Sequence, residues 1–389
     1  MLACQSTEMA EDNLLTLIPN PVEEGGEPNL FVSQDGAVYL SWIEYLDDTT
    51  DVLQFSRWEN EGWSAPIPVS KGTDWFVNWA DFPSLAAYEG SGQNLAAHWL
   101  QMSAEGTYDY DVKIAQSSDG GQNWSDPFVL HRDSIAAEHG FVTLLPLSED
   151  RMFATWLDGR NTKKEGPENA MTLRCAEFDP DGNLYEEAEL DSRICDCCQT
   201  DATLTSNGPL IVYRDRSESE IRDISIVRKI NGQWTAPKTL YEDNWTIAGC
   251  PVNGPAADSK GEKLAVAWYS MAENKPQVKV VFSADAGESF RPPVRLDDGN
   301  PLGRVDVIFL SDDKILVSWL EKTAEGAEIR AAKVAFEEDQ IQEKYTLVQS
   351  SDSRKSGFPI IAASKEQVFM AWTDVDSIST TVKTALIKI

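Results

Sequence analysis

Four cysteines in two segments are the clearest chemical signal in the sequence. Cys195, Cys197 and Cys198 form a C-x-C-C stretch, and Cys250 follows in an Ala-Gly-Cys-Pro stretch. Sulfurs grouped in this way can form disulfides in an oxidising compartment. They can also bind a soft metal ion, copper or zinc, as thiolates, or form a redox-active pair such as a strained Cys197–Cys198 bridge. The sequence leaves these three interpretations open.

Two further segments place arginines beside aspartates. The candidate ligand-binding arginines are Arg160, Arg214, Arg216 and Arg222, and Arg304 could point into the same region. In a chain this acidic, several guanidinium groups together indicate a pocket that holds a carboxylate or another anion. The alternative is a lattice of Arg–Asp pairs that only orders the loops. If the site is catalytic, Asp158 and Asp215 are candidates for a carboxylate pair that includes a general acid of raised pKa.

Aromatic and histidine side chains add further candidates. Trp79, which follows Trp75 and Phe76, could offer a sugar ring a flat apolar platform, or it could be buried between structural units. His139 could join a metal site or make ordinary hydrogen bonds. His98 precedes a core tryptophan, and we expect it to be structural. The chain has no convincing Ser-His-Asp set, phosphate-binding loop or H-E-x-x-H zinc motif.

The charge of the chain limits its partners. Its 33 Lys and Arg against 64 Asp and Glu give a formal net charge of −31. Such a surface repels nucleic-acid phosphates, so we expect no nucleic-acid partner. It also repels anionic lipid headgroups, and its other effect is to keep the protein soluble. We expect a monomer whose ligand is a small anion or a carbohydrate.

The N-terminus resembles the end of a bacterial lipoprotein signal. Leu2 and Ala3 precede Cys4 and a polar stretch, which makes Cys4 the lipid-bearing residue. The alternative is a cysteine placed there by chance. On the first interpretation residues 1–12 are a tether, and the protein is extracytoplasmic and lipid-anchored, in the periplasm or at the cell surface. It then contacts the membrane only through the lipid on Cys4, since no apolar run is long enough to span a bilayer.

A short apolar run that ends in an aromatic residue recurs seven times, and it organises the whole chain. The closing residues, at spacings of 51 to 57 residues, are Trp42, Trp99, Trp156, Tyr213, Trp268, Trp319 and Trp372. A nearly fixed period of this size indicates an array of similar units, and alternating strands with turn residues between them indicate short antiparallel sheets. We therefore predict one all-β domain, residues 13–389, a seven-bladed β-propeller of four-stranded antiparallel blades.

The ends of the chain are predicted to close this ring. The last blade has only the strand Thr381–Ile389 after Trp372, and the N-terminal segment Asn13–Pro19 has the character of its missing fourth strand. Joining the two would protect the strand edges. Strand polarity then puts tight turns on one rim and long loops on the other. The cysteines and the arginines both fall in long loops, where function usually lies.

Two turns carry a family resemblance. The stretches that begin at Ser117 (SSDGGQNW) and Ser283 (SADAGESF) resemble Asp-boxes, S-x-D-x-G-x-x-W/F. Asp119 can accept hydrogen bonds within its turn, Gly121 allows a positive φ, and Trp124 can fill the blade. The chain thus resembles the Asp-box (BNR-repeat) sialidase-like propellers, in an uncharacterised branch with a CDCC motif. In that family the box is structural and lies opposite the ligand site.

The resemblance implies a ligand-binding propeller, with two departures from sialidases. The chain has seven repeats where the family's sialidases have six blades, and Glu27-Pro28-Asn29-Leu30 stands where they have an Arg-Ile-Pro motif. No Tyr/Glu nucleophile pair can be placed. The leading hypothesis is a protein that recognises a small anionic or carbohydrate ligand, with glycoside hydrolysis as a possible activity. The alternatives are a metal-binding or redox protein that uses the cysteines, and a protein-interaction platform.

Overall fold

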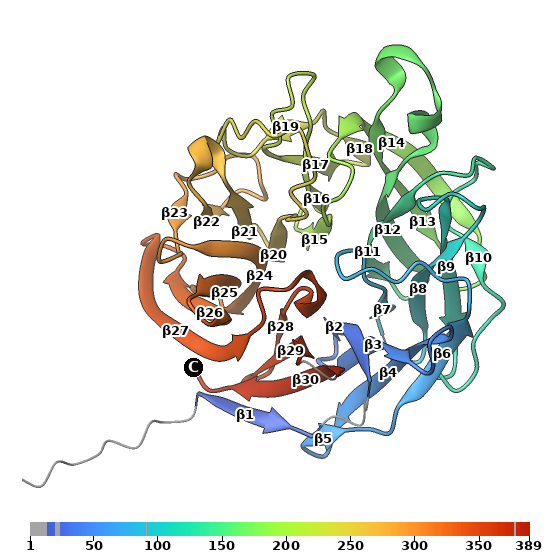
Figure 1. Cartoon of the computed structure of the whole chain (residues 1–389), viewed down its shortest axis with the longest axis horizontal. Helices are drawn as coiled ribbons and strands as arrows, with labels where there is room; N and C mark the ends of the chain where they lie inside the picture. The colour runs from blue at the N-terminus through green and yellow to red at the C-terminus, as the bar shows by residue number, and fades with distance from the viewer. Residues whose placement is uncertain (1–13, 20–23, 91, 377–378) are drawn as a thin grey trace, which may run out of the picture.

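The computed structural model describes residues 14–19, 24–90, 92–376 and 379–389. In this part of the chain seven antiparallel sheets form a ring, which Figure 1 shows as a run of colour from blue to red around the centre. The prediction of an all-β, seven-bladed propeller is confirmed. The predicted tether, with Cys4, lies outside the described residues. None of the helices in the described chain has the length and apolar character of a membrane span.

Each blade runs from its inner strand outwards. Blade 1 contains β2 (Gly25–Val32), β3 (Val38–Tyr45), β4 (Asp51–Glu59), β5 (Gly62–Trp63) and β6 (Ile67–Gly72). Blade 2 contains β7 (Ser84–Ala87), β8 (Leu95–Met102), β9 (Tyr110–Ser117) and β10 (Phe128–Val129). Blade 3 contains β11 (His139–Ser148), β12 (Arg151–Asp158), β13 (Met171–Phe178) and β14 (Leu184–Ile194). Blade 4 contains β15 (Asp201–Thr205), β16 (Gly208–Arg214), β17 (Ile224–Ile230), β18 (Gln233–Trp234) and β19 (Lys238–Thr239).

The remaining blades follow the same plan. Blade 5 contains β20 (Ala256–Lys260), β21 (Lys263–Ser270), β22 (Gln277–Ser283) and β23 (Val294–Arg295). Blade 6 contains β24 (Pro301–Ser311), β25 (Lys314–Thr323), β26 (Gly326–Ala335) and β27 (Gln340–Ser350). Blade 7 contains β28 (Ile360–Ser364), β29 (Gln367–Val375), β30 (Thr380–Ile387) and β1 (Leu15–Ile18). Short 3-10 helices lie in the connections: η1 (Arg160–Lys163), η2 (Gly166–Glu168), η3 (Ala272–Asn274) and η4 (Arg354–Ser356).

The N-terminal strand closes the ring as predicted. β1 pairs antiparallel with β30, with Leu15 opposite Ile387 and Ile18 opposite Thr384. Figure 1 shows the blue β1 beside the red β30. Trp63 of blade 1 donates from Nε1 to Thr384 Oγ1 at 2.9 Å, so blade 1 also contacts this junction. The two ends of the chain therefore hold the first and last blades together, and the strand edges there are paired.

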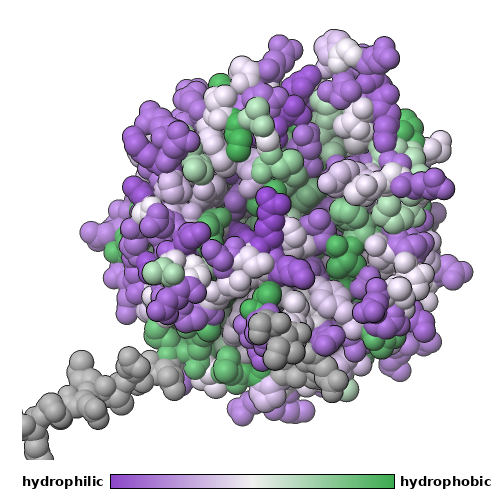
Figure 2. Space-filling view, viewed as in Figure 1, coloured by the Kyte–Doolittle hydropathy of each residue, from purple (hydrophilic) through white to green (hydrophobic). Residues whose placement is uncertain are grey.

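The blades pack face to face because both faces of their middle strands are apolar. Trp156 on β12 is fully buried with Leu100 and Val112 of blade 2. Trp319 on β25 is buried in the same way against Val278 of blade 5. Burial of these repeated aromatic residues removes large apolar areas from water and stabilises the ring. By contrast, the face shown in Figure 2 is largely hydrophilic, in keeping with the acidic composition.

The two Asp-box-like turns share one hydrogen-bond pattern. Ser117 Oγ donates to Asp119 at 2.8 Å, and Asp119 accepts from the backbone N–H of Asn123 at 2.9 Å. Gly121 has φ +89°, a conformation that glycine adopts at least cost. The second turn repeats these bonds around Asp285. The turns are thus stabilised locally, and they contain none of the groups that could do chemistry on the loop-rich rim.

Candidate functional site

The cysteine and arginine segments lie side by side. The loop with Cys195 follows β14, and the loop with Arg214 follows β16 of the next blade. The backbone N–H of Cys195 donates to the carbonyl of Arg214 at 3.1 Å, and Ile194 forms a β-bridge with Asp215. Loops that are distant in sequence therefore bring thiols and guanidinium groups into one site.

Three sulfur atoms converge at this site. The Sγ of Cys195 lies 3.4 Å from that of Cys198 and 3.9 Å from that of Cys197. The three Sγ atoms all lie within 4.8 Å of one another. Thiolates around a tetrahedral zinc ion, at about 2.3 Å from the metal, would be about 3.8 Å apart. No disulfide joins any of the cysteines that the structure describes, from Cys175 to Cys250.

The surroundings of Cys195 favour its thiolate. Arg222 Nη1 donates to Cys195 Sγ at 3.1 Å. Burial disfavours the charged sulfur, but hydrogen bonds from Cys197 and Cys198 and the charge of Arg222 outweigh it and lower the Cys195 pKa well below its ordinary value. A thiolate is the form of cysteine that binds metals and attacks electrophiles. By contrast Cys175, within β13, has its pKa raised to about 12 by burial.

Cys250 completes the group from the neighbouring loop. Its side chain is exposed, whereas Cys195 and Cys198 are buried and Cys197 is half-buried. A hydrogen bond with Cys197 lowers the Cys250 pKa. The same loop donates from the backbone N–H of Asn253 to Cys198 Sγ at 3.4 Å. Cys250 therefore lies beside Cys197, at the edge of the group that the Sγ atoms of Cys195, Cys197 and Cys198 form.

Two of the candidate arginines bind protein groups around the thiols. Arg216 pairs with Glu220 at 2.7 Å and with Asp196 at 3.1 Å. Arg222 pairs with Glu220 at 2.9 Å and donates from Nε to the carbonyl of Ile247 at 3.1 Å. These contacts agree with the alternative in which the arginines form ion pairs that only order the loops, because each guanidinium already contacts a carboxylate of the protein.

Arg214 is a buried brace between blades. It is 2% exposed, and its guanidinium donates to the carbonyls of Asn253, Arg222 and Tyr269 at 2.6 to 2.9 Å. It also lies over the Trp245 ring, 4.9 Å from the centroid. These bonds fix the loops that carry Arg222 and Cys250, so the geometry gives Arg214 a positioning role.

Arg160 and Asp158 lie in a second cluster, between blades 2 and 3. Arg160 binds Asp158 through two N–H groups at 2.8 and 2.7 Å, and its Nη2 also reaches Asp133 at 2.9 Å. His131 and His139 stack beside them with ring centroids 3.7 Å apart. His139 Nε2 lies 3.3 Å from Asp133 and 3.7 Å from Asp158. His139, which the sequence left between a metal site and ordinary hydrogen bonds, thus contacts this cluster and no cysteine of the described chain.

The two carboxyls that are candidates for catalysis have different environments. Burial alone would raise the Asp158 pKa, but the bonds from Arg160 and the nearby charges of His139 and Arg160 lower it. Burial raises the Asp215 pKa to about 6, and Asp191 adds to this. Asp215 accepts from Ser225 Oγ at 3.0 Å. No hydrogen bond joins Asp158 to Asp215 in the described chain, and they belong to separate clusters.

Trp79 packs at the inner ends of the blades. Its ring stacks on Phe358, with centroids 5.9 Å apart and 12° between the planes. The Arg304 guanidinium lies 4.9 Å from the centre of the same ring. Arg304 is buried, and this lowers its pKa to about 10. It donates to Ser356 Oγ at 2.7 Å, which ties blade 6 to the loop before blade 7.

A carboxyl pair that the sequence did not reveal lies near the thiols. Tyr110 donates from its hydroxyl towards Glu138 at 3.0 Å and Asp81 at 3.3 Å. Burial raises the pKa of Glu138 to about 8 and that of Asp81 to about 7. Cys250 is among the groups whose charge affects Glu138. These residues meet only because Tyr110 and Glu138 form a β-bridge between blades, which no local motif signals.

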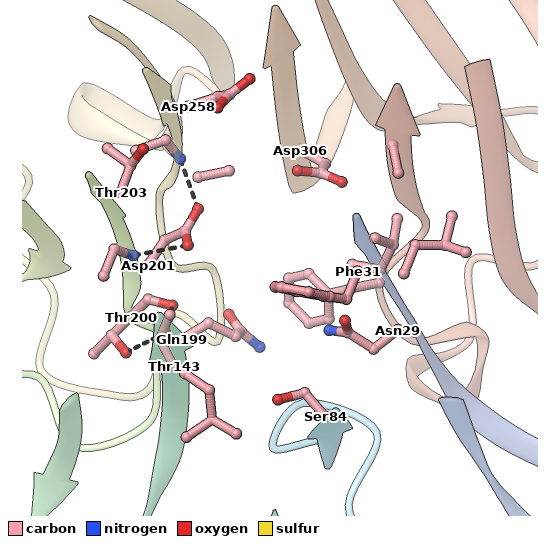
Figure 3. A pocket seen from close by; sticks show the side chains of 18 of the residues that line it. Asn29, Phe31, Ser84, Thr143, Gln199, Thr200, Asp201, Thr203, Asp258 and Asp306 are labelled. Carbon is pink, nitrogen blue, oxygen red and sulfur yellow. Dashed lines mark hydrogen bonds between the residues drawn. The ribbon is translucent and has the colours of Figure 1, made fainter. Parts of the chain in front are cut away.

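The centre of the ring is a cavity of about 420 Å³ that both polar and apolar residues line. Figure 3 shows Asp201 and Asp258 on one wall and Asp306 with Asn29 across from them. Each of the three aspartates accepts a backbone N–H from the next blade, at 2.7 Å. Burial raises their pKa values to about 7, 6 and 8 respectively. They therefore connect neighbouring blades, a role that the sequence analysis missed.

The comparisons with known proteins identify the fold. No protein-family model and no curated protein matches the chain. The phage phi92 endosialidase matches with TM-score 0.55 and 10% identity, over 96% of this chain and 69% of that one. An α-L-arabinofuranosidase from Fusarium graminearum matches with TM-score 0.53 and 10% identity, over 97% of each chain. A protein of unknown function from Dyadobacter fermentans matches with TM-score 0.52 and 10% identity, over 96% and 97%. The chain has a sialidase-like propeller fold.

Proposed function

We propose that the protein binds one soft metal ion, copper(I) or zinc, through the thiolates of Cys195, Cys197, Cys198 and Cys250. The observation that carries this proposal is the convergence of three Sγ atoms within 4.8 Å, from one C-x-C-C loop. Two of the Sγ–Sγ distances are 3.4 and 3.9 Å. One is slightly shorter and the other slightly longer than the distance between two sulfurs of a zinc–thiolate tetrahedron, about 3.8 Å. Copper(I) accepts the same soft ligands.

The groups around the sulfurs suit a metal site. Metal-binding thiols must lose their protons, and Arg222 at 3.1 Å favours the thiolate of Cys195. The N–H of Asn253 supports Cys198 in the same way at 3.4 Å. Hydrogen bonds to the ligand atoms from residues that do not themselves bind the metal orient the ligands and tune the affinity of the site for the metal. Arg214 fixes both supports, because it holds the carbonyls of Arg222 and Asn253.

Metal titration of the reduced protein tests the proposal. Protein purified without metal, under argon, is titrated with zinc or copper(I) against a chelator of known affinity. We expect one ion per chain, and for the double variant Cys195→Ser/Cys198→Ser a loss of affinity larger than the about 10- to 100-fold that the loss of a supporting hydrogen bond typically causes. Cys175→Ser is the matched control, since Cys175 is a buried thiol outside the cluster, and it should bind as the wild type does. Two disulfides in the purified protein, or no binding by the reduced form, would overturn the proposal.

A second candidate function is glycoside hydrolysis on the same rim. The specific observation is the Glu138–Tyr110–Asp81 group, because a carboxyl with a pKa of about 8 is protonated at neutral pH and can act as a general acid. The propeller fold shared with an arabinofuranosidase and an endosialidase agrees with it. Here the sugar would contact the carboxyl pair, while the arginines and Trp79 order the rim.

A panel of aryl glycosides tests this second candidate. We expect hydrolysis by the wild type and a large loss in Glu138→Gln, which keeps the shape but cannot donate a proton in the same way. Glycan binding by Arg214→Ala is compared with glycan binding by the wild type, since the Arg214 guanidinium contacts backbone carbonyls of the protein. No turnover of any glycoside by the wild type would remove hydrolysis.

A further inference from the structure

The four thiols differ in their access to solvent. Cys195 is 1% and Cys198 is 2% exposed, Cys197 is half-buried, and Cys250 is exposed. An ion that arrives from solution therefore cannot reach the two innermost sulfurs directly. The first sulfur that it can meet is that of Cys250, and the next is that of Cys197.

The loop that carries Cys250 is fixed on both sides of that residue. On one side the carbonyl of Ile247 accepts from Arg222 Nε at 3.1 Å, and Arg222 also binds Cys195. On the other side the N–H of Asn253 donates to Cys198 Sγ at 3.4 Å. Cys250 lies midway between these two anchors and forms a hydrogen bond with Cys197. The exposed thiol is thus held at the cluster.

A third contact keeps this arrangement tight. A side chain at Gly254 would bring its Cβ within 2.1 Å of the carbonyl of Gln199, so the Cys250 loop and the C-x-C-C loop approach each other at a point that admits only glycine. Gln199 also accepts from the N–H of Gly254 at 3.0 Å. The two loops therefore behave as one unit, with the sulfurs in order from surface to interior.

We propose that Cys250 is the capture ligand of the metal site, which takes the ion from a thiol-bearing carrier and passes it inwards. The inference rests on the proposed function above. The Cys250 thiolate adds to the ion as one carrier thiolate leaves, and Cys197 replaces the second carrier thiolate. Cys195 and Cys198 then bind the ion, and each protein thiol that becomes a ligand releases one proton to water. The two carrier thiolates leave with their electron pairs and take up one proton each, the number of metal–sulfur bonds rises from two to four, and no electron is transferred.

The rate of loading separates a capture ligand from an ordinary one. The probe is the glutathione complex of copper(I) or zinc, mixed with reduced, metal-free protein, and the bound ion is followed over time. We expect Cys250→Ser still to take up one ion per chain, but about tenfold more slowly than the wild type. Cys175→Ser should load at the wild-type rate.

Each outcome decides between distinct conclusions. A wild-type rate in Cys250→Ser would overturn the capture role and leave the metal site standing. A loss of equilibrium binding in Cys250→Ser as large as in Cys195→Ser/Cys198→Ser would also overturn it, because Cys250 would then be needed to hold the ion and not mainly to load it. No binding by the wild type would remove the metal site itself. Because Cys250 is exposed, its replacement leaves the core unchanged, which circular dichroism checks.

Discussion

In the described part of this propeller, metal-capable side chains gather around the cysteines and around the His131–His139 pair, and the two clusters differ in where the arginine is. In the His131–His139 cluster, Arg160 Nη2 lies within 3.2 Å of carboxylate oxygens of Asp133, Asp158 and Glu187. In the cysteine cluster Arg222 contacts one sulfur, from the side. A guanidinium among carboxylates takes the place that a metal cation would occupy, whereas one beside a sulfur only favours the thiolate.

The two clusters also differ in ligand chemistry. The first consists of carboxylates and imidazoles, which are strongly hydrated when free and need a buried counter-charge. The second consists of sulfurs, which are soft and bind copper(I) or zinc tightly. Similar lists of ligand residues thus form an ionic lattice around Arg160 and, at the cysteines, a group of sulfurs that we propose binds a metal ion. The difference between the two clusters can be tested by a substitution in each of them.

The largest effect is expected from removal of the central arginine in the lattice. Arg160→Ala removes the guanidinium that pairs with the buried carboxylate of Asp158 and the half-buried carboxylate of Asp133, so the free energy of unfolding should fall by about 3–5 kcal/mol. In a Cys195→Ser background, zinc should then raise the Tm of the Arg160→Ala variant by binding His139 and Asp133. Chemical denaturation and thermal melts measure both.

Lys164→Ala is the control for this prediction. It breaks an exposed pair with Glu168, 3.1 Å long, and should change stability by less than about 0.5 kcal/mol. If zinc stabilises the protein equally with and without Arg160, the guanidinium does not exclude the metal, and the comparison fails.

A smaller effect is expected from the arginine beside the thiols. Arg222→Met removes the positive charge that, together with the hydrogen bonds from Cys197 and Cys198, lowers the Cys195 pKa, so fewer thiolates are present at neutral pH and metal affinity should fall about 10- to 100-fold. The deficit should shrink as pH rises, because the thiol then ionises without help. Competitive metal titration at several pH values measures this.

Arg216→Met is the matched control, since Arg216 contacts Asp196 and Glu220 but no sulfur in the described chain. Its affinity should stay within a few-fold of the wild type. An affinity of Arg222→Met equal to the wild type at every pH would show that the guanidinium has no part in the metal site.

The smallest effect is a pH dependence in the lattice. Burial lowers the His131 pKa, but hydrogen bonds and charges from Asp111 and Asp133 outweigh it and raise the pKa overall. Charged His131 therefore stabilises the fold at low pH, and this contribution is lost as pH rises through the raised pKa. We expect His131→Gln to lower Tm more at about pH 6 than at about pH 9. Equal losses at both pH values would contradict the assignment.

The sequence predicted the ring because the relevant signals are local and repeated. The apolar runs that end at Trp42 through Trp372 recur at a nearly constant spacing, and each run alone specifies a buried strand. The pairing of β1 with β30 followed from the count of strands in the last blade. The same strand polarity put the cysteine and arginine loops on one rim, where Cys195 and Arg214 are hydrogen-bonded.

The roles of single side chains were less accessible to sequence. The inward-facing Asp201, Asp258 and Asp306 stand where alternation alone predicts ordinary strand residues, yet each binds the backbone of the next blade. Glu138 and Tyr110 come from different blades and meet through one bridge. An aspartate in each of three successive inner strands was the one available signal.

The sequence by itself determined the propeller, its closure and the identity of the unusual side chains, because strand periodicity and turn residues act over a few positions of the chain. The tertiary structure alone decided which groups face each other. It put Arg160 among carboxylates, Arg222 beside a sulfur and Cys250 at the surface. These outcomes depend on loop paths and on charges brought together from different blades, and such long-range contacts leave no periodic pattern in the chain.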